Sequence, residues 1–157
     1  MGLYRSLYDN LKDQHRTLRQ IVSRVEGERL AQHPAPGKWS IHDNITHLAK
    51  YQPVFIDRIR IILETHEPRI DRYTAETDPE FEMWRKWDNE RLLNVLDDDR
   101  TLIFSFISSL REEELDRIGI HGRFGRLSVT QWTEFFLLHE AHHIYTIFQL
   151  ANDTHMK

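Results

Sequence analysis

The chain has 157 residues, enough for one compact domain with a sizeable core, and we expect a single domain over residues 1–157. It has ten histidines and no cysteine, which excludes disulfides and thiolate metal ligands. The formal net charge of −4 argues against a nucleic-acid-binding protein, which would carry a basic face. No apolar run has the length of a membrane span and the N-terminus has no signal-peptide core, so we expect a cytoplasmic protein without membrane contact.

The first half of the chain predicts two helices. The first spans residues 3–26, where apolar residues recur at three- and four-residue intervals and Gly27 follows the last of them. A link that contains prolines and a glycine cannot be helical and separates the two. The second helix begins after Ser40, a typical N-cap with Asp43 in the first turn, and it ends before Pro68.

Two further segments are predicted before the last helix. Residues 68–80 are polar and are interpreted as a long loop, after which a third helix spans residues 81–110. Within that helix the acidic run at residues 97–99, together with Arg100, is interpreted as a solvent-exposed face. A connection containing three glycines follows, and a short strand near residues 118–120 is the one extended piece that the pattern allows.

The last helix opens with Ser128 and Gln131, which have the spacing of a capping box, and it continues to about Asn152. Four helices with short links and one longer crossover connection predict an all-α fold, a four-helix bundle.

Two histidines of this helix, His139 and His143, share an apolar stripe that points toward the bundle interior. They lie about 40° apart and one turn along the helix, so both imidazoles can reach a single ion. Buried imidazoles need partners for their nitrogens, and periodicity alone allows either hydrogen-bonded core histidines or metal ligands. His142 lies about 60° from His139, in a more polar row. The stripe consists of Trp132, Phe136, His139, His143, Ile147 and Leu150.

The same segment, residues 139–143, spells the H-E-x-x-H signature of zinc peptidases, in which Glu140 would be the general base. Those enzymes take a third ligand downstream. Residues 144–157 contain no glutamate and no glycine, and their one histidine, His155, lies close to the end. A peptidase is therefore disfavoured, and a third ligand has to come from upstream.

Six upstream histidines are candidates for the third ligand. His47 lies at the edge of the apolar face of the second helix. His42 lies about 140° from His47 around the helix and points away from that face. His15 lies between two leucines of the first helix, and Gln14 is equally well placed, so either side chain could approach a central metal ion. The others, which fall in connections or at a helix end, are His33, His66 and His121.

Two segments make the sequence recognisable. G-K-W-S-I at residues 37–41, followed by N-I-T-H-L-A at residues 44–49, resembles the second-helix signature of the DinB/YfiT-like superfamily of metal-binding four-helix bundles. G-R-L-S-V-T-Q-W at residues 125–132, leading to H-E-A-H-H at residues 139–143, resembles the final-helix signature of the same superfamily. The match covers nearly the whole chain in helix order and spacing.

This resemblance implies one divalent metal ion per chain, zinc or nickel, held by His47, His139 and His143. Three imidazoles leave an open position of the kind found in catalytic zinc sites. Relatives often continue the last motif with Arg-Gly-Gln, where this chain has Ile-Tyr-Thr at residues 144–146. Characterised relatives include bacillithiol S-transferases and, more distantly, mycothiol-dependent isomerases, and many others are described as metal-dependent hydrolases.

The resemblance therefore implies a metal-dependent hydrolase or a transferase that uses a low-molecular-weight thiol as cosubstrate, acting on a small electrophilic molecule. The ion would lower the pKa of a bound water or thiol. Glu140 is the candidate catalytic base, but at about 100° from His139 it is interpreted first as a surface residue. A non-catalytic metal-binding or stress-response module, or a plain bundle with coincidental histidines, remains the alternative.

Large aromatic residues are numerous for one four-helix core. They could line a pocket, although core packing explains most of them without a ligand, and an excess of them on the surface would favour an interface. Relatives often pair through helix faces, so we expect a homodimer. The candidate pocket residues are Trp39, Tyr51, Trp84, Trp87 and Trp132.

Overall fold

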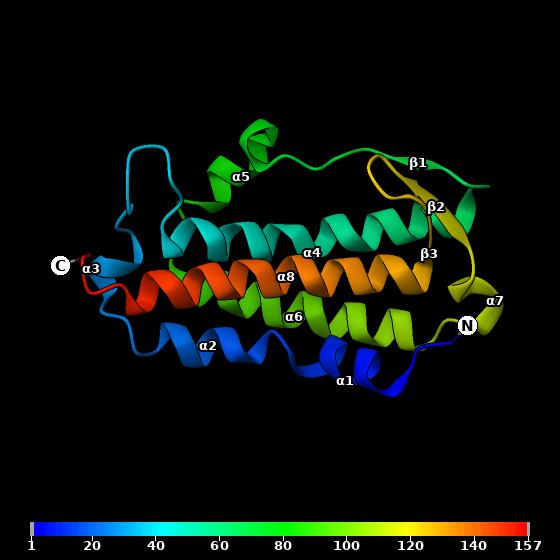
Figure 1. Cartoon of the computed structure of the whole chain (residues 1–157), viewed down its shortest axis with the longest axis horizontal. Coiled ribbons are helices and arrows are strands. Elements are labelled where there is room, and N and C mark those ends of the chain that lie inside the picture. Colours follow the sequence, from blue (N-terminus) through cyan, green and yellow to red (C-terminus); the bar gives the residue numbers. More distant parts are fainter. Residues whose placement is uncertain (1, 157) are drawn as a thin grey trace.

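The computed structural model describes residues 2–156 and contains four long helical tracts side by side, with a small sheet at one end (Figure 1). Residues 1 and 157 of the predicted domain lie outside the described residues. The predicted four-helix bundle is confirmed. Its tracts are α1 Arg5–Asp13 continued by α2 Arg16–Val22, α4 Ile41–Glu64, α6 Asn89–Ser108 and α8 Val129–Asn152.

The first tract is not the single helix predicted over residues 3–26. The chain turns at Gln14 and His15, between α1 and α2. The guanidinium of Arg100 donates a hydrogen bond to the Leu11 carbonyl at 3.3 Å. That carbonyl is the acceptor which the His15 amide would use in a continuous α-helix. The prediction failed because the competing donor comes from α6, far away in sequence.

Capping residues set the starts of α4 and α8 as predicted. The Ser40 hydroxyl accepts a hydrogen bond from the Asp43 amide, and the Asp43 carboxylate accepts one from the Ser40 amide. Ser128 and Gln131 form the same reciprocal capping box at α8. The end of α8 at Asn152 also agrees with the prediction.

The crossover between α4 and α6 is more ordered than the predicted loop over residues 68–80. The third helix predicted over residues 81–110 is split, because the Asp88 carboxylate accepts a hydrogen bond from the Arg91 amide and starts α6 afresh. The elements of the crossover are β1 Arg69–Ile70, the 3-10 turn η1 Ala75–Thr77 and α5 Pro79–Trp84. In Figure 1 this segment runs along the outer side of α4.

A three-stranded sheet closes one end of the bundle. β2 Ile118–His121 and β3 Gly125–Ser128 form an antiparallel hairpin, and β1 pairs with β2 in parallel. The short strand predicted near residues 118–120 is therefore confirmed, while its two partner strands were not predicted. Two short helices complete the chain: α3 Gly27–Leu30, which Gly27 begins rather than follows as predicted, and α7 Glu112–Leu115.

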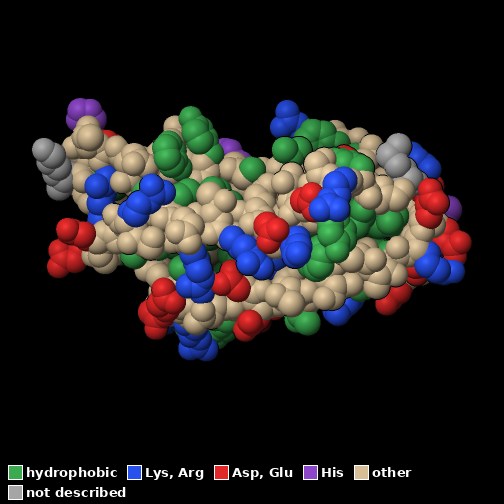
Figure 2. Space-filling model, turned by 90° about the horizontal axis from the view of Figure 1, so that it is seen from below, with side chains coloured by type: hydrophobic (Ala, Val, Ile, Leu, Met, Phe, Trp, Pro, Cys, Tyr) green, Lys and Arg blue, Asp and Glu red, His purple; other side chains and the backbone are tan. Residues whose placement is uncertain are grey.

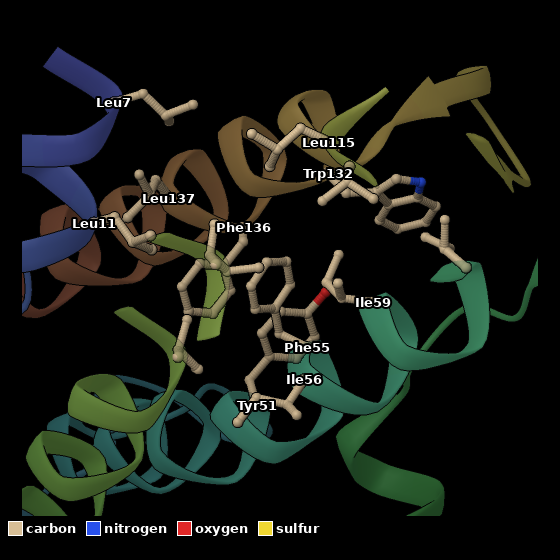
Figure 3. Close-up of a cluster of buried hydrophobic side chains, with 14 of the residues drawn as sticks. Leu7, Leu11, Tyr51, Phe55, Ile56, Ile59, Leu115, Trp132, Phe136 and Leu137 are labelled. Atoms are coloured by element: carbon tan, nitrogen blue, oxygen red, sulfur yellow. The ribbon is translucent and has the colours of Figure 1, made fainter. Parts of the chain in front are cut away.

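The core consists of two apolar clusters along the bundle axis. The cluster nearer the sheet includes Phe55 of α4 and Phe136 of α8, whose rings stack at 4.2 Å, with Leu11 of α1 beside them (Figure 3). The other cluster, toward α3 and the C-terminal end of α8, includes Ile45 and Ile147.

Between the two clusters lies a set of buried or half-buried polar side chains, which we call the middle polar layer. All four helical tracts contribute to it, each at the point where its apolar stripe is interrupted. Burial of polar groups is costly without partners, so this layer is where function is to be sought. It consists of Gln14, His15, His47, Gln52, Arg100, His139, Glu140 and His143.

The molecular surface is mixed in character on the side that carries α1 and α2. Figure 2 shows basic and acidic side chains interspersed there, with apolar patches between them. Over residues 2–156 none of the helices combines the length and the apolar character that a bilayer span requires.

Candidate metal centre

Three histidines of the middle polar layer meet between α4 and α8. One ring nitrogen of each of His47, His139 and His143 lies within 4.8 Å of the corresponding atoms of the other two. The Nε2 atoms of His47 and His139 are 3.0 Å apart. His47 is buried and the other two are half-buried, so the three nitrogens converge in a largely dehydrated space. The structure thus brings together the three residues that the resemblance implied.

Hydrogen bonding fixes the orientation of His143. Its Nδ1 lies 2.8 Å from the Asn44 side-chain oxygen, and the Asn44 amide nitrogen donates to the Ser40 carbonyl at 2.8 Å. An amide oxygen only accepts hydrogen bonds, so Nδ1 of His143 carries the proton and Nε2 keeps a free lone pair. A neighbour that sets the tautomer in this way is typical of a metal-ligating histidine.

All three imidazoles are neutral at physiological pH. Burial lowers the pKa of His47 to about 2, of His143 to about 3 and of His139 to about 4. Smaller contributions come from the neighbouring histidines and, for His139, from Arg58. Neutral imidazole is the form that donates a lone pair to a metal ion.

The donor set fits a divalent ion of the zinc or nickel type, which nitrogen ligands suit. The Nδ1 atoms of His47 and His139 are buried without a hydrogen-bond partner, so their polar contacts within the protein are incomplete. Three convergent neutral imidazoles in an apolar setting would be an unfavourable way to fill a core that held nothing else.

Aromatic rings surround the three histidines. Trp39 stacks near His143 at 6.0 Å and lies 5.1 Å from His47, while the Tyr51 ring lies 4.3 Å from that of His139. These are two of the five aromatic residues predicted to line a pocket. The other three lie elsewhere: Trp132 is buried in the cluster near the sheet, and Trp84 and Trp87 stack on each other.

Neither Gln14 nor His15 joins the histidine group. Gln14 donates through its side-chain amide to the Leu137 carbonyl at 2.9 Å and to Glu140 at 3.0 Å. The Nδ1 of His15 lies 3.4 Å from the Arg100 guanidinium. Both side chains belong to the other half of the middle polar layer.

Two other histidines on these helices also lie outside the group. His42 is held by the Asn89 side chain at 2.9 Å and the Arg85 carbonyl at 2.7 Å, and His142 is exposed. The polar row predicted for His142 agrees with this position.

Glu140 is not the surface residue that its helical angle suggested. It is 1 % exposed, one carboxylate oxygen accepts from Gln14, and the other forms an ion pair with Arg100. α8 has neighbours on several sides in the bundle, so a rotation of about 100° from His139 still faces protein. The interpretation of Arg100 as part of an exposed face is wrong for the same reason, since Arg100 is also 1 % exposed.

A signal for Arg100 was present in the sequence. It continues the buried stripe of α6, eight residues after Leu92, four after Leu96 and three before Ile103. The charge of the neighbouring aspartates obscured that spacing.

A cavity of about 400 Å³ opens near the three histidines, which do not line it themselves but contact three of its aromatic lining residues. It lies between α4, the crossover after β1, the β2–β3 hairpin and α8. Tyr51, Tyr73 and Phe135 line it, and their rings lie 4.3 Å from His139, 5.8 Å from His47 and 6.5 Å from His139 respectively. The arrangement places three candidate metal ligands one aromatic ring away from a space that a small molecule can occupy.

Comparison with known proteins places this geometry in a family. The family model described as the DinB superfamily matches residues 10–147. The YuaE protein of Bacillus subtilis (strain 168) is 28% identical over an alignment of 135 positions, and the match covers 76% of this chain and 82% of that protein. A protein of Oceanobacillus iheyensis named "Putative metal-dependent hydrolase OB0413" is 24% identical over 152 residues, covering 85% and 83%.

A solved structure shares the fold. YfiT from Bacillus subtilis, described as a probable metal-dependent hydrolase with an unusual four-helix bundle topology, superposes with a TM-score of 0.80 at 20% sequence identity. The match covers 93% of this chain and 84% of YfiT.

Proposed function

Because this chain belongs to the DinB superfamily, we propose that it is a divalent-metal-dependent enzyme in which His47, His139 and His143 hold one zinc or nickel ion through Nε2. The reaction is hydrolysis of a small electrophilic molecule, or transfer of such a molecule to a low-molecular-weight thiol. The names of the Oceanobacillus relative and of YfiT support the hydrolytic form. The protein acts in the cytoplasm as a homodimer.

The observation that carries this proposal is the convergence of three neutral imidazoles beside a cavity. When bound, the ion supplies a Lewis acid that lowers the pKa of a water or thiol at its open position. The protein contributes orientation: Asn44 holds the His143 ring, and Trp39 and Tyr51 keep water away from two sides of the histidines.

Tyr51 is a proton donor in the lining of this space. Its hydroxyl oxygen accepts a hydrogen bond from Arg58 at 2.6 Å, which leaves its own O–H free to donate to a substrate in the cavity. Burial raises the pKa of Tyr51 against the opposing effect of Arg58, so the hydroxyl stays protonated. Gln14 and Arg100 engage the two carboxylate oxygens of Glu140, so Glu140 takes no part in proton transfer.

A screen of electrophilic substrates with and without low-molecular-weight thiols tests the proposal. Turnover that requires a thiol selects transfer, and turnover in water alone selects hydrolysis. We expect His143→Ala to lose bound metal and activity, and His142→Ala, the matched control on the same helix, to keep both. An active, metal-free His143→Ala protein would contradict the proposal.

Chelation separates catalysis from a purely structural site. If the ion serves catalysis, the chelated protein loses activity and keeps its helical circular dichroism. Loss of the helices on chelation, with no substrate found, would favour the non-catalytic metal-binding module instead.

A further inference from the structure

The buried cationic side chains differ in whether a carboxylate pairs with them. Among the described residues, the lysine and arginine side chains that are buried are Lys50, Arg58 and Arg100. Lys50 lies 2.7 Å from Glu80, and Arg100 forms an ion pair with Glu140. Arg58 is 9% exposed, and within residues 2–156 no carboxylate forms an ion pair with it.

The contacts of Arg58 are all neutral. Its guanidinium donates to the Tyr51 hydroxyl at 2.6 Å and to the Asp71 backbone carbonyl at 2.8 Å. It also lies 5.5 Å from the centroid of the Tyr51 ring and 5.8 Å from that of Trp132. A buried charge without a counter-charge is costly, and the cost is removed if an anion binds beside it.

Arg58 lines this cavity, and basic side chains outnumber acidic ones in the rest of the lining. Arg72 and Arg123 are the other arginines of the wall, against one acidic residue, Asp71. His121 adds a donor: its Nδ1 accepts from the backbone amides of residues 123 and 124, so the proton stays on Nε2.

The remainder of the wall is aromatic and apolar. Rings of Tyr51, Tyr73, Phe124 and Phe135 face a space of about 400 Å³. That volume is in the usual range for a small-molecule pocket. The cavity therefore has a basic side and an aromatic side, and the rings of Tyr51 and Tyr73 on the aromatic side lie next to the convergent histidines.

We propose that this cavity binds a small organic anion whose carboxylate or phosphate group pairs with Arg58 and whose apolar body lies between the aromatic rings, with its reactive end toward His47, His139 and His143. The inference rests on the proposed function, because it names the substrate class of the same site. Arg58 is the residue that selects anionic over neutral substrates.

Binding of matched probes to the purified, metal-loaded protein tests this assignment by calorimetry. The carboxylate probe is phenylacetate with 2-phenylacetamide as its neutral counterpart, and the phosphate probe is phenyl phosphate with benzyl alcohol. We expect at least one anion to bind about tenfold or more tightly than its neutral counterpart, the ratio that a hydrogen bond to a charged group provides. The anion that binds more tightly shows whether the cavity prefers a carboxylate or a phosphate group. Equal binding of both pairs would overturn the inference without any variant.

Variants assign the preference to Arg58 rather than to the metal or the exposed arginines. Arg58→Gln should reduce the ratio of anionic to neutral affinity about tenfold. Arg60→Gln, on the same helix but 61% exposed and beside Asp57, should leave the ratio unchanged. An unchanged ratio in a folded Arg58→Gln protein would overturn the inference. Loss of stability with equal weakening of both probes would also overturn it, because Arg58 would then only support the fold.

Metal content measured on the same samples separates this inference from the proposed function. Bound metal without an anion preference refutes the substrate class alone. An Arg58-dependent preference in a protein that binds no divalent ion refutes the metal-dependent enzyme and leaves the ligand class of the cavity standing.

Discussion

The ion pair between Glu140 and Arg100 makes Glu140→Gln the most informative single substitution. Both side chains are 1% exposed, and the change removes one charge while keeping the shape. Arg100 would keep only neutral partners, among them the Gln52 side-chain oxygen at 3.1 Å and the Leu11 carbonyl at 3.3 Å. Breaking one side of a buried pair costs about 3–5 kcal/mol, a large part of the 5–15 kcal/mol that typically stabilises a domain.

Chemical denaturation followed by circular dichroism measures this change in the free energy of unfolding. Glu82→Gln provides the matched control, because Glu82 pairs with Arg85 and is 65% exposed, so its loss should cost about 1 kcal/mol or less. Combining Glu140→Gln with Arg100→Met should recover part of the lost stability, since no unpaired buried charge remains.

The same variant distinguishes a structural Glu140 from a catalytic one. Because Glu140 pairs with Arg100 in the protein interior, removal of its charge should lower the free energy of unfolding, while the folded variant keeps most of its turnover. If Glu140→Gln lowers the free energy of unfolding by less than about 1 kcal/mol but lowers the rate about 100-fold, this reasoning is refuted and Glu140 is assigned to proton transfer.

Three further outcomes are expected from other parts of the fold. Gly119→Ala should cost about 1–3 kcal/mol in a denaturation assay, because its new methyl group would lie 2.6 Å from the buried Ile62, whereas Gly122→Ala meets nothing within 4 Å and should be neutral. Burial, assisted by Arg100, lowers the pKa of His15 to about 4 from 6.5. The unfolded chain therefore binds more protons between these values, and stability should fall as the pH drops from 6.5 to 4, by about 1–3 kcal/mol less in His15→Gln than in the wild type; equal losses would exclude this role. Tyr145 is 60% exposed on α8 near other exposed apolar residues, so Tyr145→Glu should convert a dimer into a monomer in sedimentation, and a monomeric wild type would contradict the proposed dimer.

The parts of the fold that follow local rules could be predicted from the sequence. Ser40 and Ser128 mark helix starts because capping is a contact between residues three apart, and both starts agree with the structure. The inward direction of His139 and His143 follows from their place in an apolar stripe. The identity of His47 as the third member of the group came from the resemblance, because periodicity placed it only at the edge of its stripe.

The parts that depend on contacts between distant segments could not be predicted in the same way. The turn at Gln14 and His15 arises from a donor on α6, and the burial of Glu140 follows from its partner Arg100. Helical periodicity separates apolar from polar faces, so it reports a polar residue as exposed even when a partner from another helix covers it. Arg58 was hidden from the sequence in a similar way, because the Asp71 carbonyl after β1 and the Trp132 ring of α8 cover it from distant parts of the chain.

X-ray diffraction from crystals of the purified protein, recorded at the absorption edges of zinc and nickel, tests the metal centre most directly. We predict one anomalous peak per chain, which marks a metal ion about 2.0–2.2 Å from Nε2 of His47, His139 and His143. In this arrangement Asn44 keeps its hydrogen bond to Nδ1 of His143. Protein saturated with metal that shows no peak between these three rings, or a peak held by other residues, would contradict the account.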